Sequence, residues 1–247
     1  MLHRYSRLFA WVFTLILAAG LQGCAHNVAA SPAPAVSATI DKTAQSAITP
    51  DDALARLQEG NQRFVSGDSL RRDYPAQVKA TAGGQYPFAV VLSCMDSRSS
   101  PEIVFDQGIG DLFVVRVAGN YAPKDIIGSI EYATQVAGAK LVVVMGHTEC
   151  GAIKGACDNV QLGNLTTVIQ ALQPAVDDVK DVSGDRNSKN KQFVLLVTEA
   201  NVRRTVAKLR SESPILHVME QSGQIKVIGA IDDISTGQVN FFQWNDN

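Results

Sequence analysis

Short apolar runs rich in valine and isoleucine recur along this chain and alternate with segments of helical periodicity. A run that is apolar at most positions, rather than at every second one, predicts a strand buried on both faces. Such runs are Phe88–Leu92, Leu112–Val117, Leu141–Met145, Phe193–Thr198 and Ile225–Ile231. Because strands of this kind need helices on both sides of their sheet, the pattern predicts an α/β fold with a mainly parallel β-sheet flanked by helices.

The segments around these runs predict the remaining elements. Lys124–Ala137 and Thr198–Ser211 have helical spacing, and Val239–Phe242 is expected to add an edge strand. The polar stretch Asp181–Lys191 indicates a solvated loop. Thr49 is followed by a proline and two aspartates, which predicts a capped helix start and an N-terminal helical arm.

The first residues have the composition of a targeting segment. A histidine and two arginines precede the apolar run Leu8–Leu21, which suits a signal-peptide core and is short for a membrane span. The run ends in Leu-Gln-Gly-Cys, which resembles a bacterial lipobox with Cys24 as the acylated residue. Gln22 is larger than the usual residue, so cleavage further along the chain stays an alternative. We expect export to the periplasm or cell envelope, with a lipid anchor in the membrane.

Composition divides the rest of the chain into a linker and one domain. From Ala25 to Thr49 the sequence is rich in Ala, Ser, Thr and Pro, which predicts a flexible tether between a signal peptide at 1–24 and a domain at 50–247. The formal net charge is -2 and the pI is about 6.1. A chain with this balance offers no positive field to a phosphate backbone, so nucleic acid is not an expected partner.

Side chains that bind metals follow two of the predicted strands. Cys94 comes after the run that ends at Leu92, and His147 and Cys150 follow the run that ends at Met145. Because the carboxyl ends of parallel strands meet at one edge of a sheet, these side chains are expected to lie together. Two thiolates and one imidazole suit zinc, and three protein ligands leave the open position of a catalytic site. Disulfide pairing of the four cysteines is the alternative that this spacing disfavours.

Asp96 and Arg98 stand beside the first cysteine of this predicted site. A carboxylate next to a zinc-bound water would favour the hydroxide, because it accepts a hydrogen bond from that water. Arg98 can hold the Asp96 carboxylate ionised and turned away from the metal through a bidentate pair. Without such a partner, Asp96 could itself occupy the fourth zinc position and close the site.

At these residues the chain resembles the β-class carbonic anhydrases, here a bacterial, exported member. The shared motifs are Cys-x-Asp-x-Arg, starting at Cys94, and His-x-x-Cys, starting at His147. The flanking segments also look like the family: Phe-Asp-Gln-Gly at 105–108, the run from Gly110 to Asn120, and the run from Gly146 to Gly151. The resemblance extends from about Thr49 to the end of the chain.

The resemblance implies a zinc enzyme with one Zn²⁺ per subunit, which hydrates carbon dioxide reversibly to bicarbonate and a proton through zinc-bound hydroxide. It implies Cys94, His147 and Cys150 as the ligands, with Asp96 a ligand only in a closed state. Gln107 resembles a residue that lines the substrate pocket in part of the family, with a turn-forming glutamine as the alternative. Gly119 is expected to allow close backbone approach near that pocket, with a simple loop glycine as the alternative. A homodimer, or a multiple of dimers, is also implied.

The chain departs from the family pattern at Ser99-Ser100, which replaces an apolar residue common after the arginine, and in a regulatory pocket that binds bicarbonate in some members. Of its three residues only Arg116 matches, because Val91 and Asp232 stand where a tryptophan and a tyrosine are usual. Regulation through that pocket is therefore not expected. Two other functions stay open: hydrolysis of carbonyl sulfide or carbon disulfide on the same fold, and noncatalytic binding of zinc or bicarbonate.

Overall fold

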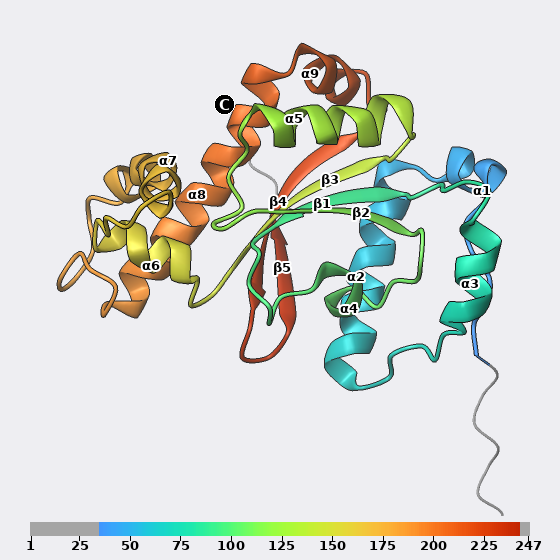
Figure 1. The fold of residues 1–247 in the computed structure, drawn as a ribbon, viewed down its shortest axis with the longest axis horizontal. Helices are drawn as coiled ribbons and strands as arrows, with labels where there is room; N and C mark the ends of the chain where they lie inside the picture. The colour runs from blue at the N-terminus through green and yellow to red at the C-terminus, as the bar shows by residue number, and fades with distance from the viewer. Residues whose placement is uncertain (1–34, 243–247) are drawn as a thin grey trace, which may run out of the picture. The chain divides into compact units, whose positions relative to one another are not determined.

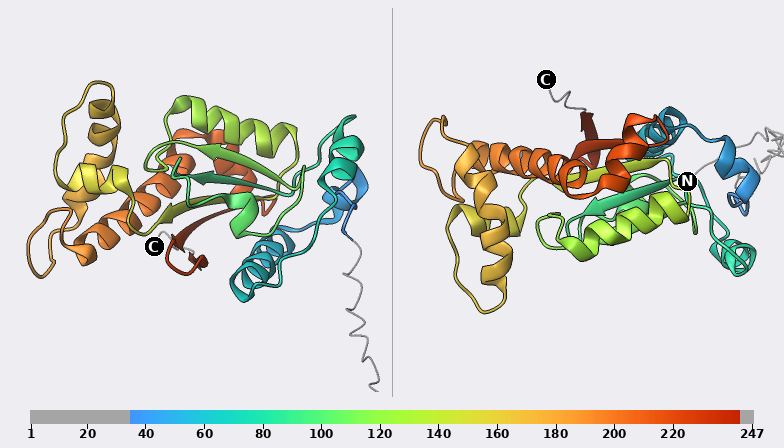
Figure 2. Two further views of the ribbon diagram at one scale, coloured as in Figure 1. Left: turned by 60° about the horizontal axis from the view of Figure 1, so that its bottom comes forward. Right: turned by 90° about the horizontal axis from the view of Figure 1, so that it is seen from above.

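A computed structural model of the chain describes residues 35–242 (Figures 1 and 2). The predicted signal peptide, Cys24 and the first part of the predicted linker lie outside the described residues. Among the helices of residues 35–242, none combines the length and the apolar character that crossing a membrane requires.

The centre of the fold is a five-stranded sheet in the order β2-β1-β3-β4-β5. The first four strands in this order run parallel, and β5 pairs antiparallel with β4. The strands are β1 (Ala89–Ser93), β2 (Leu112–Arg116), β3 (Leu141–His147), β4 (Lys226–Asp233) and β5 (Gln238–Phe242). The predicted mainly parallel sheet is confirmed, and so is the edge strand near the carboxyl end.

One predicted strand is wrong, because Phe193–Thr198 lies in the long helix α8 (Lys191–Glu212). The Asn190 side chain caps this helix by accepting a hydrogen bond from the backbone N–H of Phe193. Phe193, Val194 and Val197 are buried at helical spacing in an apolar cluster with α6 and α7. A six-residue apolar run fits a buried helix face as well as a buried strand, and here the packing surface is helical.

Helix α2 (Pro50–Ser66) begins where the sequence predicts. Thr49 caps it, and the Asp52 side chain accepts a hydrogen bond from the backbone N–H of Thr49 in return, which completes a capping box. Three other helices lie near it in the chain: α1 (Lys42–Ala47), α3 (Tyr74–Thr81) and α4 (Pro101–Val104).

The predicted flexible linker is ordered in its second part. Helix α1 lies inside it, and Val36 forms an isolated β-bridge with Arg72. The buried amide of Gln45 donates hydrogen bonds to the carbonyls of Pro87 and Ala137, which fastens α1 to the domain. Composition missed this, because these hydrogen bonds join residues that are far apart in the sequence.

The remaining helical elements follow β2 in the chain. They are α5 (Lys124–Glu131), the π-helix η1 (Tyr132–Val136), α6 (Gly151–Cys157), α7 (Leu165–Asp178) and α9 (Pro214–Gln221). The helix predicted from Lys124 to Ala137 is thus confirmed as α5 followed by η1. Residues 179–190 connect α7 to α8 without a helix or strand, as expected for a solvated loop.

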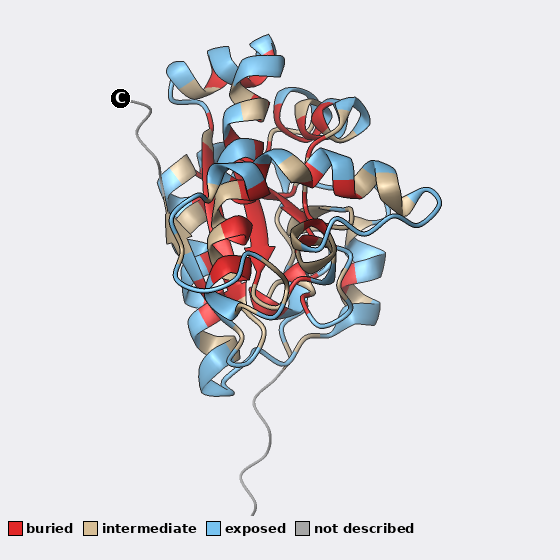
Figure 3. Cartoon of the chain, turned by 90° about the vertical axis from the view of Figure 1, so that its left-hand side faces the viewer, coloured by how far each residue is buried: buried red, intermediate tan, exposed pale blue. Residues whose placement is uncertain are grey.

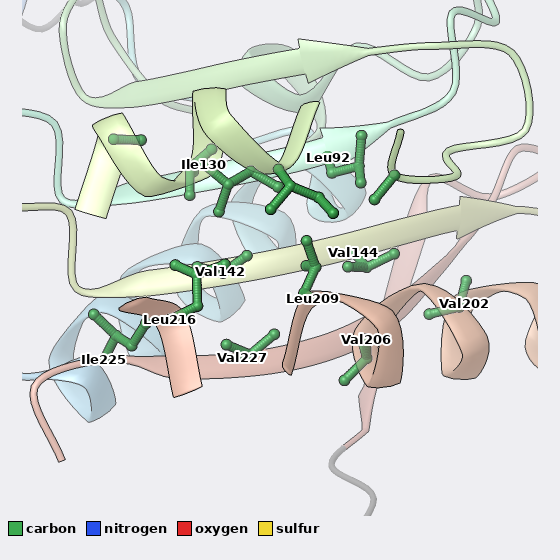
Figure 4. Close-up of a cluster of buried hydrophobic side chains, with 14 of the residues drawn as sticks. Leu92, Ile130, Val142, Val144, Val202, Val206, Leu209, Leu216, Ile225 and Val227 are labelled. Carbon is green, nitrogen blue, oxygen red and sulfur yellow. The ribbon is translucent and has the colours of Figure 1, made fainter. Parts of the chain in front are cut away.

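Side chains alternate between two apolar clusters along the central strands. Leu92 faces α5, α8 and α9 on one side of the sheet (Figure 4), and Val90 belongs to the same cluster. Val91 faces α2 and Phe105 on the other side. Strands β1 and β3 are buried at every position, so burial is concentrated in the middle of the sheet (Figure 3). This double-sided packing holds the carboxyl ends of β1 and β3 in fixed positions, and the candidate site begins there.

Candidate metal centre

Cys94, His147 and Cys150 meet at the carboxyl edge of the sheet. Cys94 directly follows β1, His147 ends β3, and the two strands are paired in parallel. One ligand atom from each side chain lies within 4.8 Å of those of the other two, and all three residues are buried. The topology therefore brings together the three side chains that the sequence places after separate strands.

The spacing and chemistry of these atoms fit a zinc ion. The sulfurs of Cys94 and Cys150 are 3.9 Å apart and both thiols are free. Two sulfurs at about 2.3 Å from one tetrahedral ion would be roughly 3.8 Å apart. His147 Nδ1 is 2.9 Å from the Thr148 carbonyl and so carries the proton that it donates. Its Nε2 keeps a lone pair and is buried without a hydrogen-bond partner among the described residues, as expected of a ligand atom.

Without a metal, the thiols and the imidazole influence one another. A hydrogen bond from Cys150 lowers the pKa of the Cys94 thiol, and the same contact together with burial raises the pKa of Cys150. Burial opposes the charged form of His147, but the nearby Cys94 sulfur and Asp96 carboxylate outweigh it and raise the pKa of the ring. A bound cation would ionise both thiols, because a coordinated thiol loses its proton.

Gly119 contacts the first sulfur through its backbone. Its N–H donates to Cys94 Sγ at 3.4 Å, and its φ of +76° is a left-handed conformation that favours glycine. A Cβ at this position would lie 2.7 Å from Leu172 Cδ1. The Asn201 side chain, from α8, donates to the Gly119 carbonyl at 2.8 Å. Asn201 was missed by sequence reasoning, because no motif links it to a loop 82 residues away.

Asp96 is turned toward Arg98 rather than into the cluster. Arg98 Nε donates to Asp96 Oδ1 at 2.9 Å and Nη2 donates to Oδ2 at 2.8 Å, which forms a bidentate pair. These bonds hold the pKa of Asp96 well below its ordinary value. Asp96 Oδ2 nevertheless lies only 3.9 Å from His147 Nε2. An ionised carboxylate thus stands beside the candidate metal position without belonging to the three-residue group.

A second carboxyl, that of Asp232, is linked to the segment that follows β1 and carries Asp96. Asp232, in β4, is buried opposite His147 in the strand pairing, and its Oδ2 accepts a hydrogen bond from Ser99 Oγ at 2.6 Å. Burial raises the pKa of this carboxyl. Asp232 replaces a tyrosine in the resemblance described above, and the sequence carried no signal that Ser99 would be its partner.

Gln107 lies elsewhere in this chain. Its side-chain amide donates to the Phe105 carbonyl at 2.6 Å. It lines a cavity of about 800 Å³ with residues of α1, α2 and α3, and with Arg72 and Asp111 from the connecting segments. Of the two residues expected to line a substrate pocket, the structure therefore brings Gly119 to the cluster and places Gln107 against a different set of helices.

Comparisons with known proteins agree on one family. A family model described as carbonic anhydrase matches residues 89–239. Carbonic anhydrase 2 of Mycobacterium tuberculosis is 35% identical over 198 residues, covering 76% of this chain and 91% of the relative. A carbonic anhydrase of Mycolicibacterium smegmatis is 33% identical over 196 residues, covering 77% of this chain and 92% of the relative.

Solved structures show the same fold. A Coccomyxa β-carbonic anhydrase in complex with acetazolamide superposes with a TM-score of 0.60 at 26% identity, covering 76% of this chain and 85% of that one. The β-carbonic anhydrase CcaA also gives a TM-score of 0.60, at 25% identity, covering 77% of this chain and 95% of that one.

Proposed function

The chain belongs to the β-class carbonic anhydrase family, and we propose that it interconverts carbon dioxide and bicarbonate at a zinc ion held by Cys94, His147 and Cys150. The observation that carries the proposal is the convergence of two sulfurs and an unpartnered imidazole nitrogen at one buried point. Bound there, zinc would supply the Lewis acidity that makes water a nucleophile at neutral pH.

Asp96 and Arg98 prepare the position next to the ion. The Asp96 carboxylate is ionised at neutral pH, so it can accept a hydrogen bond from the attacking water but cannot donate one. Such an acceptor directs the lone pair of the water oxygen toward carbon dioxide. Arg98 keeps this carboxylate charged and oriented through both of its oxygens. Without Arg98, the carboxylate would be free to turn toward the metal position.

The surroundings of the sulfurs suit an apolar substrate. Cys94 and Cys150 belong to a buried cluster that includes Ile153 and Leu172, with Tyr121 partly buried against it. Apolar walls of this kind accommodate carbon dioxide and exclude bulk water from the reacting atoms. Because Gly119 has no side chain, its backbone can approach the Cys94 sulfur, whereas a Cβ at this position would collide with Leu172.

The chemical test combines metal analysis with stopped-flow hydration of carbon dioxide. We expect about one zinc per chain, and Asp96→Asn should lower kcat by about a hundredfold while leaving zinc content unchanged. Asp178→Asn, which removes a surface carboxylate paired with Arg204, is the control. Full activity in Asp96→Asn would refute the role given to the carboxylate, and a zinc-free active protein would refute the whole proposal. Carbonyl sulfide assayed on the same preparations tests the alternative substrate.

We also propose that the functional unit is a homodimer built on strand β2. This strand is an edge of the sheet, and its apolar residues Leu112–Val115 are only partly buried. Tyr132, which makes an edge-to-face contact with Phe113, is 53% exposed. A second copy would cover this edge. It would also supply Gln107 to a substrate pocket of the first copy, because within one chain Gln107 lies away from the metal-binding residues.

Export and lipid attachment through Cys24 remain our proposal for where the enzyme works. The support is the apolar segment and lipobox-like sequence that precede the domain. Fractionation of cells that produce the full chain should recover it with membranes. When the cells are grown with a labelled fatty acid, the wild-type chain should incorporate the label and Cys24→Ala should not. Recovery of the wild-type chain only in the cytoplasm would contradict the proposal.

A further inference from the structure

Arg116 braces the loop that carries Cys94 and Asp96. It ends β2, directly opposite Ser93 in the parallel pairing, so its side chain reaches the loop that follows β1. The guanidinium Nε donates to the Cys94 carbonyl at 3.0 Å. Its Nη2 donates to the carbonyls of Asp96 at 2.5 Å and Ser99 at 3.1 Å. Three backbone carbonyls of one short loop thus converge on one cation, and hydrogen bonds to a charged donor are the stronger kind.

The opposite side of the same loop is fastened to β4. Ser99 is 1% exposed and its hydroxyl donates to Asp232 Oδ2 at 2.6 Å. The backbone N–H of Ser99 donates to the Asp96 carbonyl at 3.2 Å, which closes a turn within the loop. Ser99 therefore joins both braces, because its carbonyl accepts from Arg116 and its hydroxyl donates to Asp232. The two braces reach the loop from strands on either side of β1.

The position of this loop decides what occupies the space beside the zinc ligands. Asp96 Oδ2 is 3.9 Å from His147 Nε2. Two nitrogen or oxygen ligands of one tetrahedral zinc would be roughly 3.4 Å apart, so this carboxylate lies close to the separation that a further ligand would have from His147. The bidentate pair with Arg98, whose side chain is 52% exposed, orients the Asp96 carboxylate relative to the loop that carries both residues. The place of the carboxylate beside the zinc ligands therefore depends on the position of that loop.

We propose that Arg116 and the Ser99–Asp232 pair are positioning residues that fix the Cys94–Ser100 loop and so keep the Asp96 carboxylate off the fourth metal position. The inference rests on the proposed function, since it assumes that Cys94, His147 and Cys150 hold a metal. Arg116 acts through the loop backbone, and Asp232 acts through Ser99; neither needs to touch the substrate.

The test measures access to the metal without measuring catalysis. The full-length protein is loaded with Co²⁺ in place of zinc, and thiocyanate is titrated while the visible absorption of the cobalt is followed. Arg116→Ala should weaken thiocyanate binding by about tenfold, the equivalent of losing one charge-assisted hydrogen bond, because the freed carboxylate competes for the position. Adding Asp96→Asn to that variant should restore the wild-type affinity, since the neutral amide competes poorly.

Controls separate this effect from general damage. Arg204→Ala removes an arginine that pairs with Asp178 on the surface, and it should bind thiocyanate as the wild type does. Ser99→Ala should weaken binding in the same direction as Arg116→Ala, so it serves as the second variant if Arg116→Ala does not fold. Asp232→Asn keeps an acceptor for Ser99 and should retain the wild-type affinity.

The outcomes distinguish the inference from the function beneath it. A wild-type protein that takes up no Co²⁺, or whose cobalt spectrum ignores thiocyanate, would refute the proposed metal site itself. If the wild type responds, and both Arg116→Ala and Ser99→Ala bind thiocyanate with the wild-type affinity, the bracing role is wrong. It is also wrong if affinity is lost but Asp96→Asn does not restore it, because the loss would then have a cause other than the carboxylate.

Discussion

The buried carboxylate of Asp106 has two arginine partners that compensate its charge. The side chain of Asp106 is 2% exposed and pairs with both Arg63 and Arg72. Its φ of +47° lies in the left-handed region, which aspartate and asparagine tolerate better than most residues. Burial alone would raise the pKa of Asp106, but the hydrogen bonds from Arg72 and Arg63 outweigh it and hold the pKa below its ordinary value.

Replacing Asp106 by asparagine should lower the free energy of unfolding by about 3 kcal/mol at pH 7, because two arginines lose their buried partner. The folded-state pKa is depressed, so the stabilisation is complete above the unfolded-state pKa of about 3.9 and disappears as the pH falls through the folded-state value. Urea unfolding of both proteins between pH 7 and pH 3 should show a constant gap that narrows below about pH 4. A gap that widens in acid would contradict this account.

Among the elements, α2 depends on one glycine for its close approach to the domain. A Cβ on Gly60 would lie 1.8 Å from the Phe105 carbonyl oxygen, which belongs to the backbone and cannot rotate away. Asn61, next to it, donates to the carbonyls of Val104 and Gly237. The polar contacts of Asn61 therefore require the backbone of α2 to lie very close to that of residues 104–105.

Gly60→Ala should destabilise the protein by about 3 kcal/mol or more, since α2 must move away from Phe105 and lose the contacts of Asn61. Gly83→Ala is the control, because this exposed glycine lies in the turn after α3 with nothing within 4 Å of an added Cβ. There, the substitution should change the stability by less than about 0.5 kcal/mol. Thermal unfolding of both variants provides the comparison, and equal effects of the two substitutions would contradict the packing argument.

Elements also show where sequence patterns succeed and fail. Four apolar runs became strands as predicted; β1, β3 and β4 are buried at nearly every position, and β2 is partly buried at the edge of the sheet. The fifth, Phe193–Thr198, became the first turns of α8, because the residues after Thr198 continue in helical spacing and Asn190 supplies a cap. The apolar run by itself does not distinguish these outcomes; the flanking cap and the length of the periodic segment do.

For the molecule as a whole, the edge strand β2 and the exposed Tyr132 are the reason to expect a second copy. Tyr132→Glu should convert the dimer into monomers, because it places a charge in an apolar interface. Val218→Glu is the control, since Val218 is 61% exposed on α9 and lies outside that surface. Analytical ultracentrifugation gives the masses. A dimer that survives Tyr132→Glu would move the interface to another surface.

The sequence by itself determined the sheet, the capped arm helix and the meeting of Cys94 with His147 and Cys150. These follow from local periodicity, from cap chemistry and from the rule that parallel strands end at one edge. Only the tertiary structure decided that Asn201 supports Gly119, that Arg116 and Asp232 brace the loop of Asp96, and that Gln107 lies away from the cluster. Apart from the last, these contacts join residues 17 to 133 positions apart through a few hydrogen bonds, which leave no periodic trace in a sequence.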